Sequence, residues 1–260
     1  MMAIERRFGV DEKRLWLVPL LAGLGLLALW EVGFLFAGYS LLLFPPPSTV
    51  LARFVDLVVQ GRLQPDLLAS MRRLVLGFAL GATPGLAVGL AMGWSRRARG
   101  LFDPVIAAIH PVPKVALFPI FLLLFGLGEA SKLVAIALSA FFPMALNAMA
   151  GVRSIPPVCF EVARTFGAGN VRTFWRVVLP GSLPMVTTGI RIGANSAFVL
   201  TLVVEIASAN DGLGHLIWTA WEGLRTADLY AAVAVIAAIG IGLGAALRRL
   251  ARAVAPWQVG

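Results

Sequence analysis

The sequence predicts an all-α polytopic membrane protein, with about six transmembrane helices that form a single domain over residues 1–260. Hydrophobic residues make up 59% of the chain and charged residues 13%, about half the charged fraction of a typical water-soluble domain. The apolar residues also gather in runs close to the roughly 20 residues that a helix needs to cross a bilayer. We predict membrane spans at residues 15–37, 74–94, 104–125, 132–152, 185–207 and 229–247.

The positive charges fall mostly on one side of these predicted spans. The N-terminal segment, the second and fourth loops and the C-terminal tail hold most of the 22 Lys and Arg residues, which predicts that these segments and both termini are cytoplasmic. Arg72 and Arg73 are the exception, because they lie beside a span on the opposite side. The charges flank spans rather than forming one basic face, so the net charge of +9 does not indicate a nucleic-acid partner.

The first apolar run follows basic residues, as in a secretory signal, but it is too long for the apolar part of a signal peptide. We therefore expect a retained first span. Residues 45–47 are all proline and interrupt the chain after it. Ser48 then starts a short amphipathic helix to about Gln60, which is too short and too polar to span and is expected to lie along the outer membrane surface.

The second predicted span carries a glycine at every fourth position: Gly77, Gly81, Gly85, Gly89 and Gly93. This spacing places bare backbone along one helix face. Small residues at such spacing allow two helices to approach closely in lipid, where no hydrophobic force drives helices together. We expect this face to pack against another helix of the bundle; the alternative is that it lines a path for a solute.

The third predicted span is interrupted by four prolines: Pro104, Pro111, Pro113 and Pro119. A proline inside a helix leaves an upstream carbonyl without its hydrogen bond, and such backbone at membrane depth is tolerated only inside protein or along a wet cavity. We expect a broken span, and Lys114 beside the break is a candidate for a polar path. The alternative for Lys114 is that its ammonium reaches the membrane surface. For His110, a bond to a nearby carbonyl is favoured.

Three further polar residues lie within predicted spans. Asn147 lies in the fourth span, and Asn195 and Glu205 lie in the fifth; a structural bond between helices is the alternative for Asn195. Glu205 is near the outer end of its span, where we favour a structural or gating role over direct contact with a solute. The candidate residues of a translocation path are Pro111, Pro113, Lys114, Pro119, Asn147, Asn195 and Glu205.

The longest loop on the predicted cytoplasmic side covers residues 153–184. Pro156 and Pro157 permit a helix to begin, and Gly167 ends it. A second helix is expected from about Asn170, with Pro180 as its stop. The loop is therefore expected to form a helix–turn–helix on the inner membrane face, a shape that suits docking to a partner.

The spacing in this loop resembles the EAA signature of ABC importer permeases. The chain reads Glu161-Val162-Ala163, three residues, Gly167, nine residues, then Val177-Val178-Leu179-Pro180, with valine in place of one alanine and one isoleucine of the family pattern. The resemblance implies that the first helix docks in a groove of an ATPase and couples ATP-driven closure to gate movement. The residues that it assigns to coupling and to the return into span five are Glu161, Val162, Ala163, Arg164, Gly167, Ala168, Gly169, Val177, Leu179 and Pro180.

Five further segments resemble the nitrate, sulfonate and taurine branch of these permeases. They are Pro45-Pro-Pro-Ser48, Ser70-x-Arg-Arg73, Pro111-x-Pro113, Phe125-Gly-x-Gly-Glu-x-Ser-Lys132, and Glu205 followed by Gly212-Leu-Gly214. The resemblance implies the type I ABC importer permease fold, a bacterial cytoplasmic (inner) membrane location and a small anionic solute such as a sulfonate, taurine or nitrate. It also implies a second permease subunit in a homodimer, two ATPase subunits and a substrate-binding protein.

No cofactor is expected in this chain, and ATP and Mg²⁺ are expected on the partner ATPase. The sequence lacks the phosphate-binding loop Gly-x-x-x-x-Gly-Lys-Ser/Thr of an ATPase, a metal-binding cluster and a catalytic triad, and Cys159 is its single cysteine. We therefore expect a transport subunit rather than an enzyme. The alternatives are the same importer class with a different organic solute, or a secondary transporter driven by an ion gradient. Secondary transporters usually show internal repeats, and none is clear in this sequence.

Overall fold

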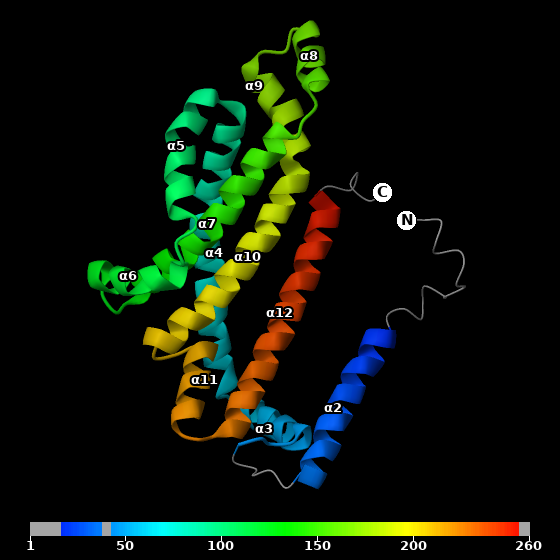
Figure 1. Ribbon diagram of the computed structural model, residues 1–260, viewed down its shortest axis with the longest axis vertical. Helices are drawn as coiled ribbons and strands as arrows, with labels where there is room; N and C mark the ends of the chain where they lie inside the picture. The colour runs from blue at the N-terminus through cyan, green and yellow to red at the C-terminus, as the bar shows by residue number, and fades with distance from the viewer. Residues whose placement is uncertain (1–16, 38–42, 255–260) are drawn as a thin grey trace.

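The computed structural model describes residues 17–37 and 43–254, and in these two ranges every regular element is helical. Four helical segments are long and apolar enough to cross a membrane. They are α4 (Leu63–Trp94), α7 (Glu129–Arg153), the segment Asn170–Ser208 that ends in α10 (Leu179–Ser208), and α12 (Thr226–Val254). These helices run along the long axis of the molecule (Figure 1), and the predicted all-α membrane class is confirmed.

The third predicted span is a bent pair of helices, as the proline pattern predicts. Its parts are α5 (Arg96–Ile109), the 3₁₀ turn η2 (Lys114–Leu117) and α6 (Phe118–Phe125). The two halves meet at 90°, and α6 points away from the bundle (Figure 1). The break falls at residues 110–113. Pro104 remains inside α5, while Pro119 lies in the first turn of α6, where an amide would have no helical partner.

The first described helix, α2 (Leu17–Ala37), stands apart from α10 on the far side of α12 (Figure 1). Residues 15 and 16 of the predicted first span, and the basic residues before them, lie outside the described residues. The described apolar stretch Leu21–Phe36 is shorter than the roughly 20 residues of a full span. Six spans is therefore an approximate count, made of four long segments, the bent pair and α2.

The short helix α3 (Pro47–Val59) matches the predicted amphipathic helix and connects α2 to the bundle. It begins one residue before Ser48, and the Ser48 side chain bonds to Glu31 of α2 instead of capping the helix. The Glu31 carboxylate of α2 accepts hydrogen bonds from the Ser48 backbone amide (3.0 Å) and hydroxyl (2.7 Å). Further along α3, Arg53 forms an ion pair with the nearly buried Asp228 of α12. The Arg53 guanidinium also donates a hydrogen bond to the Asp228 carboxylate, and this bond raises the pKa of Arg53 above its usual value. α3 is therefore tied to α2 at its start and to α12 at its middle.

The centre of the bundle is the contact between α4 and α7. All five glycines of the predicted face lie against α7: Gly77, Gly81, Gly85, Gly89 and Gly93. A Cβ atom added at any of them would lie within 2.7 Å of an atom of α7, closer than real Cβ contacts come. The two helices approach this closely because these positions carry no side chain. α10 packs against both helices and completes the core.

The two ends of the bundle carry different elements. One end carries α8 (Pro157–Thr165) and α9 (Asn170–Thr173), and the α4–α5 corner and the end of α12 point the same way (Figure 1). The opposite end carries α3 and α11 (Leu213–Glu222). The described basic loops that predict a cytoplasmic location therefore share one end of the molecule.

The expected stop at Pro180 is wrong. The helix that starts at Asn170 continues through the π-helical turn η3 (Phe174–Val178) into α10. In a regular α-helix a proline ring clashes with the carbonyl four residues earlier. In η3 the Leu179 amide bonds to the Phe174 carbonyl, five residues back. This wider turn admits Pro180 without ending the helix.

We expect Gly81→Ala to destabilise the protein, because the added methyl group would overlap the Ala137 carbonyl of α7. Overpacking of this kind typically costs about 1–3 kcal/mol. Thermal unfolding in detergent should show a lower midpoint for this variant than for wild type. The matched control is Gly242→Ala in α12, where no atom lies within 4 Å of the added position. An equal midpoint for the two variants would contradict the packing account.

Candidate functional site

α8 begins and ends where the sequence pattern places it. Pro157 is the first residue of the helix, where its missing amide has no partner to lose. At the other end Gly167 has a φ of +66°, a left-handed conformation that favours glycine. The Gly167 amide bonds to the Arg164 carbonyl and the Ala168 amide to the Ala163 carbonyl, both at 2.9 Å, the Schellman pattern that ends a helix. The glycine of the signature therefore has a structural role.

The outer face of α8 is apolar and uncovered. Val158, Val162 and Phe166 are 57%, 49% and 82% exposed. The side chains of Glu161 and Arg164 form no hydrogen bond or ion pair within the described part of the chain. Apolar surface of this kind, rimmed by charged groups, is typical of a protein interface. α8 therefore offers a docking surface at the end of the bundle that carries the basic loops.

The inner face of α8 contacts the long helices. The ring of Phe160 lies 6.2 Å from the ring of Trp94 at the end of α4, and Trp94 lies 6.4 Å from Phe174 in η3. Phe160 and Phe174 also pack against a buried cluster that contains Val152 of α7 and Val178 of η3. α8 is therefore in direct contact with the end of α4 and packs against the cluster formed by α7 and η3.

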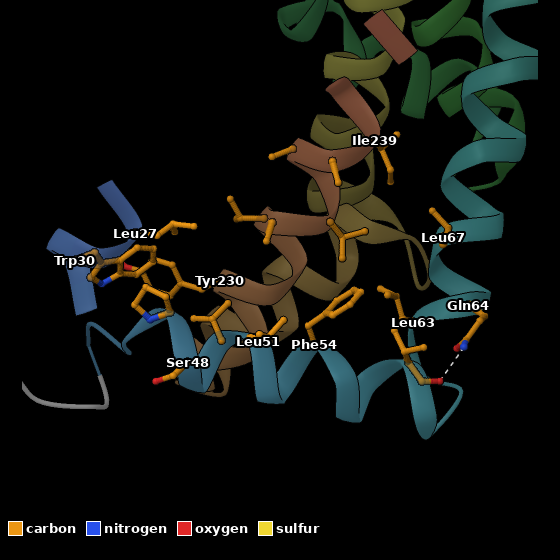
Figure 2. A pocket seen from close by; sticks show the side chains of 18 residues that line it. Leu27, Trp30, Ser48, Leu51, Phe54, Leu63, Gln64, Leu67, Tyr230 and Ile239 are labelled. Carbon is orange, nitrogen blue, oxygen red and sulfur yellow. Dashed lines mark hydrogen bonds between the residues drawn. The ribbon is translucent and has the colours of Figure 1, made fainter. Parts of the chain in front are cut away.

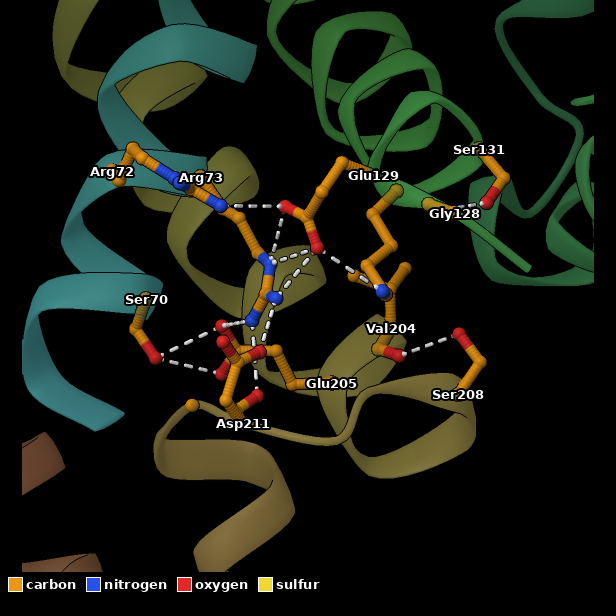
Figure 3. Close-up of polar contacts among 12 residues, drawn as sticks. Ser70, Arg72, Arg73, Gly128, Glu129, Ser131, Val204, Glu205, Ser208 and Asp211 are labelled. Carbon is orange, nitrogen blue, oxygen red and sulfur yellow. Dashed lines mark hydrogen bonds and ion pairs between the residues drawn. The ribbon is translucent and has the colours of Figure 1, made fainter. Parts of the chain in front are cut away.

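A charged network centred on the buried Arg73 and Glu205 lies near the opposite end of the bundle (Figure 3). Arg73 of α4 is 1% exposed and pairs with Glu205 of α10 at 3.0 Å, with Glu129 of α7 at 2.7 Å, and with Asp211 of the α10–α11 loop. Lys132 of α7 adds a second positive charge, 3.2 Å from Glu129. Loss of Arg73 would leave the buried Glu205 carboxylate uncompensated, so this Arg73 network fixes α4, α7 and α10 relative to one another.

The same network fixes the start of α11. The fully buried Glu205 carboxylate accepts hydrogen bonds from the Ser70 hydroxyl (2.7 Å) and the Gly214 amide (3.0 Å). The Ser70 oxygen accepts in turn from the Leu213 amide at 2.8 Å. Gly212 has a φ of +106°, and a Cβ atom there would lie 2.5 Å from the carboxyl carbon of Glu205. The first amides of α11 are therefore held by side chains of α4 and α10.

Arg72 and Arg73, the exception to the predicted charge distribution, have different surroundings. The guanidinium of Arg73 is paired with carboxylates inside the protein. Arg72 has a side chain that is 59% exposed and makes a long contact of 3.4 Å with Glu129. Because its charge is neutralised, Arg73 does not add an exposed positive charge to this end of the molecule.

Three segments that are distant in sequence meet in the Arg73 network: residues 70–73, 125–132 and 205–214. All three are among the segments that resemble sulfonate-type permeases. The sequence shows charged residues in each but not which of them pair, since 135 positions separate Ser70 from Glu205. Glu205, a candidate path residue, has no exposed surface in this arrangement.

A pocket of about 410 Å³, the Lys114 pocket, lies between η2, α7 and α10. Its polar residues are Lys114, Ser139, Asn195 and Ser196, and its apolar wall consists of Val115, Val199 and Leu200. Two of the predicted path residues, Lys114 and Asn195, therefore share one pocket. Sequence reasoning missed Ser139 and Ser196, because a single serine in an apolar helix is common and carries no pattern of its own.

The other predicted path residues lie elsewhere. Pro111 and Pro113 are exposed in the bend before η2, and Pro119 is exposed in α6. Asn147 of α7 donates a hydrogen bond of 2.8 Å to the Pro143 carbonyl, a contact within its own helix. None of these four candidate residues lines the Lys114 pocket.

A larger groove, of about 1050 Å³, lies between α2, α3 and α12 (Figure 2). Its walls are mostly apolar and include the rings of Trp30 and Tyr230. The polar side chains of Ser48 and Gln64 at this groove are already hydrogen-bonded to other parts of the chain. The groove therefore offers no charged group to compensate the cost of desolvating a charged solute.

Within the described ranges, no group of three or more His, Cys, Asp and Glu side chains is placed to hold a metal ion. Cys159 is half-buried in α8. The Arg73 network and the Lys114 pocket each bring together polar side chains from several helices. These two features and the uncovered face of α8 are the candidate functional parts of the molecule.

Comparison with known proteins identifies the class. The family described as binding-protein-dependent transport system inner membrane component matches residues 85–259, a range that contains the whole bent pair, α8, η3 and α10. The chain belongs to this family, and the resemblance inferred from the loop signature is confirmed. The protein is a permease component of an ABC importer.

Two curated permeases and one solved transporter structure are similar to this chain. The taurine transport system permease protein TauC of Escherichia coli (strain K12) is 38% identical over 224 residues, which are 84% of this chain and 82% of TauC. The aliphatic sulfonates transport permease protein SsuC of Bacillus subtilis (strain 168) is 33% identical over 243 residues, 94% of this chain and 88% of SsuC. A chain of the inward-facing MetNI methionine ABC transporter matches 73% of this chain and 94% of its own length, with a TM-score of 0.65 and 18% identity. This structural match supports the type I importer fold.

We expect Arg73→Gln to lower the folded yield and the unfolding midpoint strongly, because it leaves Glu205 buried without its counter-charge. Removing one partner of a buried ion pair typically costs about 3–5 kcal/mol. Arg72→Gln is the matched control, since its exposed pair contributes at most about 1 kcal/mol. The double variant Arg73→Met, Glu205→Met removes both buried charges and should recover part of the yield. Equal stability of the two single variants, measured by thermal unfolding in detergent, would contradict the assigned role of the network.

Proposed function

We propose that this chain forms the membrane path of an importer that is driven by separate ATPase subunits docked on α8. The main support for this proposal is the uncovered apolar face of α8, which lies at the end of the bundle with the basic loops. The sequence of this loop also keeps the residue spacing of the EAA signature. The proposed coupling residues are Glu161, Val162, Ala163, Arg164, Gly167, Ala168 and Gly169, with Val177, Leu179 and Pro180 at the passage into α10. ATP and Mg²⁺ are held by the ATPase chains.

The proposed working unit is a homodimer in which residues 1–260 of each copy act as one transmembrane domain. In support, the Lys114 pocket is open on the side of Asn195 and of Val199, which is 60% exposed, and a second copy is needed to enclose it. Two ATPase subunits dock at the α8 end, and a substrate-binding protein docks at the end with α3 and α11. The one-sided distribution of basic residues supports a cytoplasmic location of the α8 end and both termini, in a bacterial inner membrane.

The proposed solute is a small anion of the sulfonate class. The names of TauC and SsuC assign taurine and aliphatic sulfonates to those two relatives, and each aligns with more than four-fifths of this chain. The Lys114 pocket supports an anion over a cation, because its one ionisable side chain is a lysine.

The proposed cycle starts when ATP closes the ATPase subunits and moves the α8 helices of both copies. Contacts among Trp94, Phe160 and Phe174 pass this movement to α4 and to the start of α10. The Arg73 network holds the other ends of the same helices together, so they tilt as a unit. ATP and the loaded binding protein drive the cycle only to the extent that each binds its two states with different affinity.

We expect the Val162→Glu variant to insert into the membrane and fold normally, but to bind the ATPase subunits much more weakly than wild type. Val162 is 49% exposed on the outer face of α8, and a carboxylate there must be desolvated when the partner docks. Loss of an interface anchor typically costs about 2 kcal/mol or more, about a thirtyfold loss of affinity. The measurement is the amount of ATPase that co-purifies and the stimulation of ATP hydrolysis by the loaded binding protein.

Val59→Glu is the matched control for this experiment. Val59 is 79% exposed in α3, at the opposite end of the bundle, so the same substitution there should leave ATPase co-purification unchanged. Normal co-purification and normal stimulation in the Val162→Glu variant would show that α8 is not part of the ATPase interface, and would refute the proposed coupling.

A further inference from the structure

The Lys114 pocket lies midway along two of the long helices. Ser139 is ten residues from the start of α7 and fourteen from its end, and Asn195 is sixteen residues from the start of α10 and thirteen from its end. At 1.5 Å per residue, both positions are at least about 15 Å from either end of their helix. Polar side chains are costly at such depth and mark the routes of polar solutes.

Lys114 brings a positive charge to this depth without a counter-charge. Its ammonium donates a hydrogen bond to the His110 carbonyl and lies 5.1 Å from the centroid of the Phe142 ring. No carboxylate in residues 17–37 or 43–254 pairs with it. An ammonium has three N–H donors, so two remain after the bond to the carbonyl. The carbonyl and the ring therefore position the charge but do not neutralise it.

Asn195 and Ser196 add neutral hydrogen-bond donors beside this charge. Neither side chain forms a hydrogen bond within the described part of the chain. Ser139 differs, because its hydroxyl already donates to the Ile136 carbonyl at 2.7 Å and can only accept further bonds. The donors left for an oxyanion therefore belong to Lys114, Asn195 and Ser196, and hydrogen bonds to an ionised acceptor are stronger than neutral ones.

The volume and the apolar wall of the pocket match a short organic anion. A volume of about 410 Å³ falls within the range of about 300–1,000 Å³ for small-molecule sites. The wall of Val115, Val199 and Leu200 offers apolar contact to an alkyl group. An inorganic anion such as nitrate would leave this wall without a partner.

Two other cationic groups of the bundle, Arg73 and Arg191, do not suit this role. Arg73 already bonds to three carboxylates. Arg191 is exposed on α10, four residues before Asn195, and does not line the pocket. The large groove between α2, α3 and α12 has no lysine or arginine in its lining.

We propose that the Lys114 pocket binds the sulfonate group of the solute during its passage. This inference rests on the proposed function, because it takes its solute from a sulfonate importer. Lys114 attracts the anion, Asn195 and Ser196 donate hydrogen bonds to its oxygens, and the alkyl part lies on the apolar wall. Binding must also be weak enough for release, which passage through a membrane requires.

The test is uptake of labelled taurine by vesicles that hold the complete transporter with its ATPase and binding protein. We expect Lys114→Gln to lower the taurine taken up per ATP hydrolysed about tenfold to a hundredfold, the effect of losing one hydrogen bond to a charged group. Hydrolysis stimulated by the loaded binding protein should remain, since Lys114 is distant from α8. Lys114→Arg should retain most of the uptake. Asn195→Asp, which adds a carboxylate at an exposed position of the pocket, should lower uptake strongly.

Arg191→Gln is the matched control, because it removes a positive charge from the same helix outside the pocket. Its uptake should remain within about threefold of wild type. Unchanged uptake in Lys114→Gln, or an equal loss in Arg191→Gln, would refute sulfonate binding in the Lys114 pocket. Neither result would contradict the proposed function. Wild-type vesicles that import no solute in response to ATP would refute the proposed function and, with it, this site.

Discussion

The close contact between the glycine face of α4 and the backbone of α7 determines where the charged and polar groups of the bundle lie. A side chain at Gly81 would overlap the carbonyl of Ala137, so any larger residue would push the helices apart. Arg73 lies on the same helix as these glycines and reaches Glu129 of α7 and Glu205 of α10 at hydrogen-bond distance. Separation of the helices would break these pairs and leave buried charge uncompensated. Close backbone packing and the ion network therefore depend on each other.

α7 and α10 form contacts at the α8 end, in the middle and at the opposite end of the bundle, and they connect the functional parts of the chain. At the α8 end, Val152 of α7 packs in the cluster that receives Phe160 and Phe174. At mid-height, Ser139 and Asn195 line the Lys114 pocket. At the other end, α7 and α10 each supply a carboxylate to Arg73. A movement of α8 thus acts on one end of two helices whose middles form the pocket and whose far ends are held together.

Regular patterns in the sequence predict the parts of the structure that depend on local backbone chemistry. The glycine period predicts the packing face, and the prolines predict the broken span. The sequence fails where distant residues decide the outcome. α4 begins at Leu63, eleven residues before the predicted span, because Arg73 is paired inside the bundle rather than exposed in a loop. Pro180 does not end its helix, because η3 is a π-helical turn. The serines of the Lys114 pocket have no local signal, since only packing of α7 against α10 brings them together.

In the proposed cycle a separate ATPase, acting through α8, drives import of a sulfonate-class solute. The most direct measurement is uptake of labelled taurine into vesicles that contain the permease, the ATPase and the binding protein, with all ion gradients abolished. We expect uptake that requires ATP and both partner proteins and that continues without any ion gradient. Uptake by the permease alone, driven by an ion gradient in the absence of ATP, would contradict it.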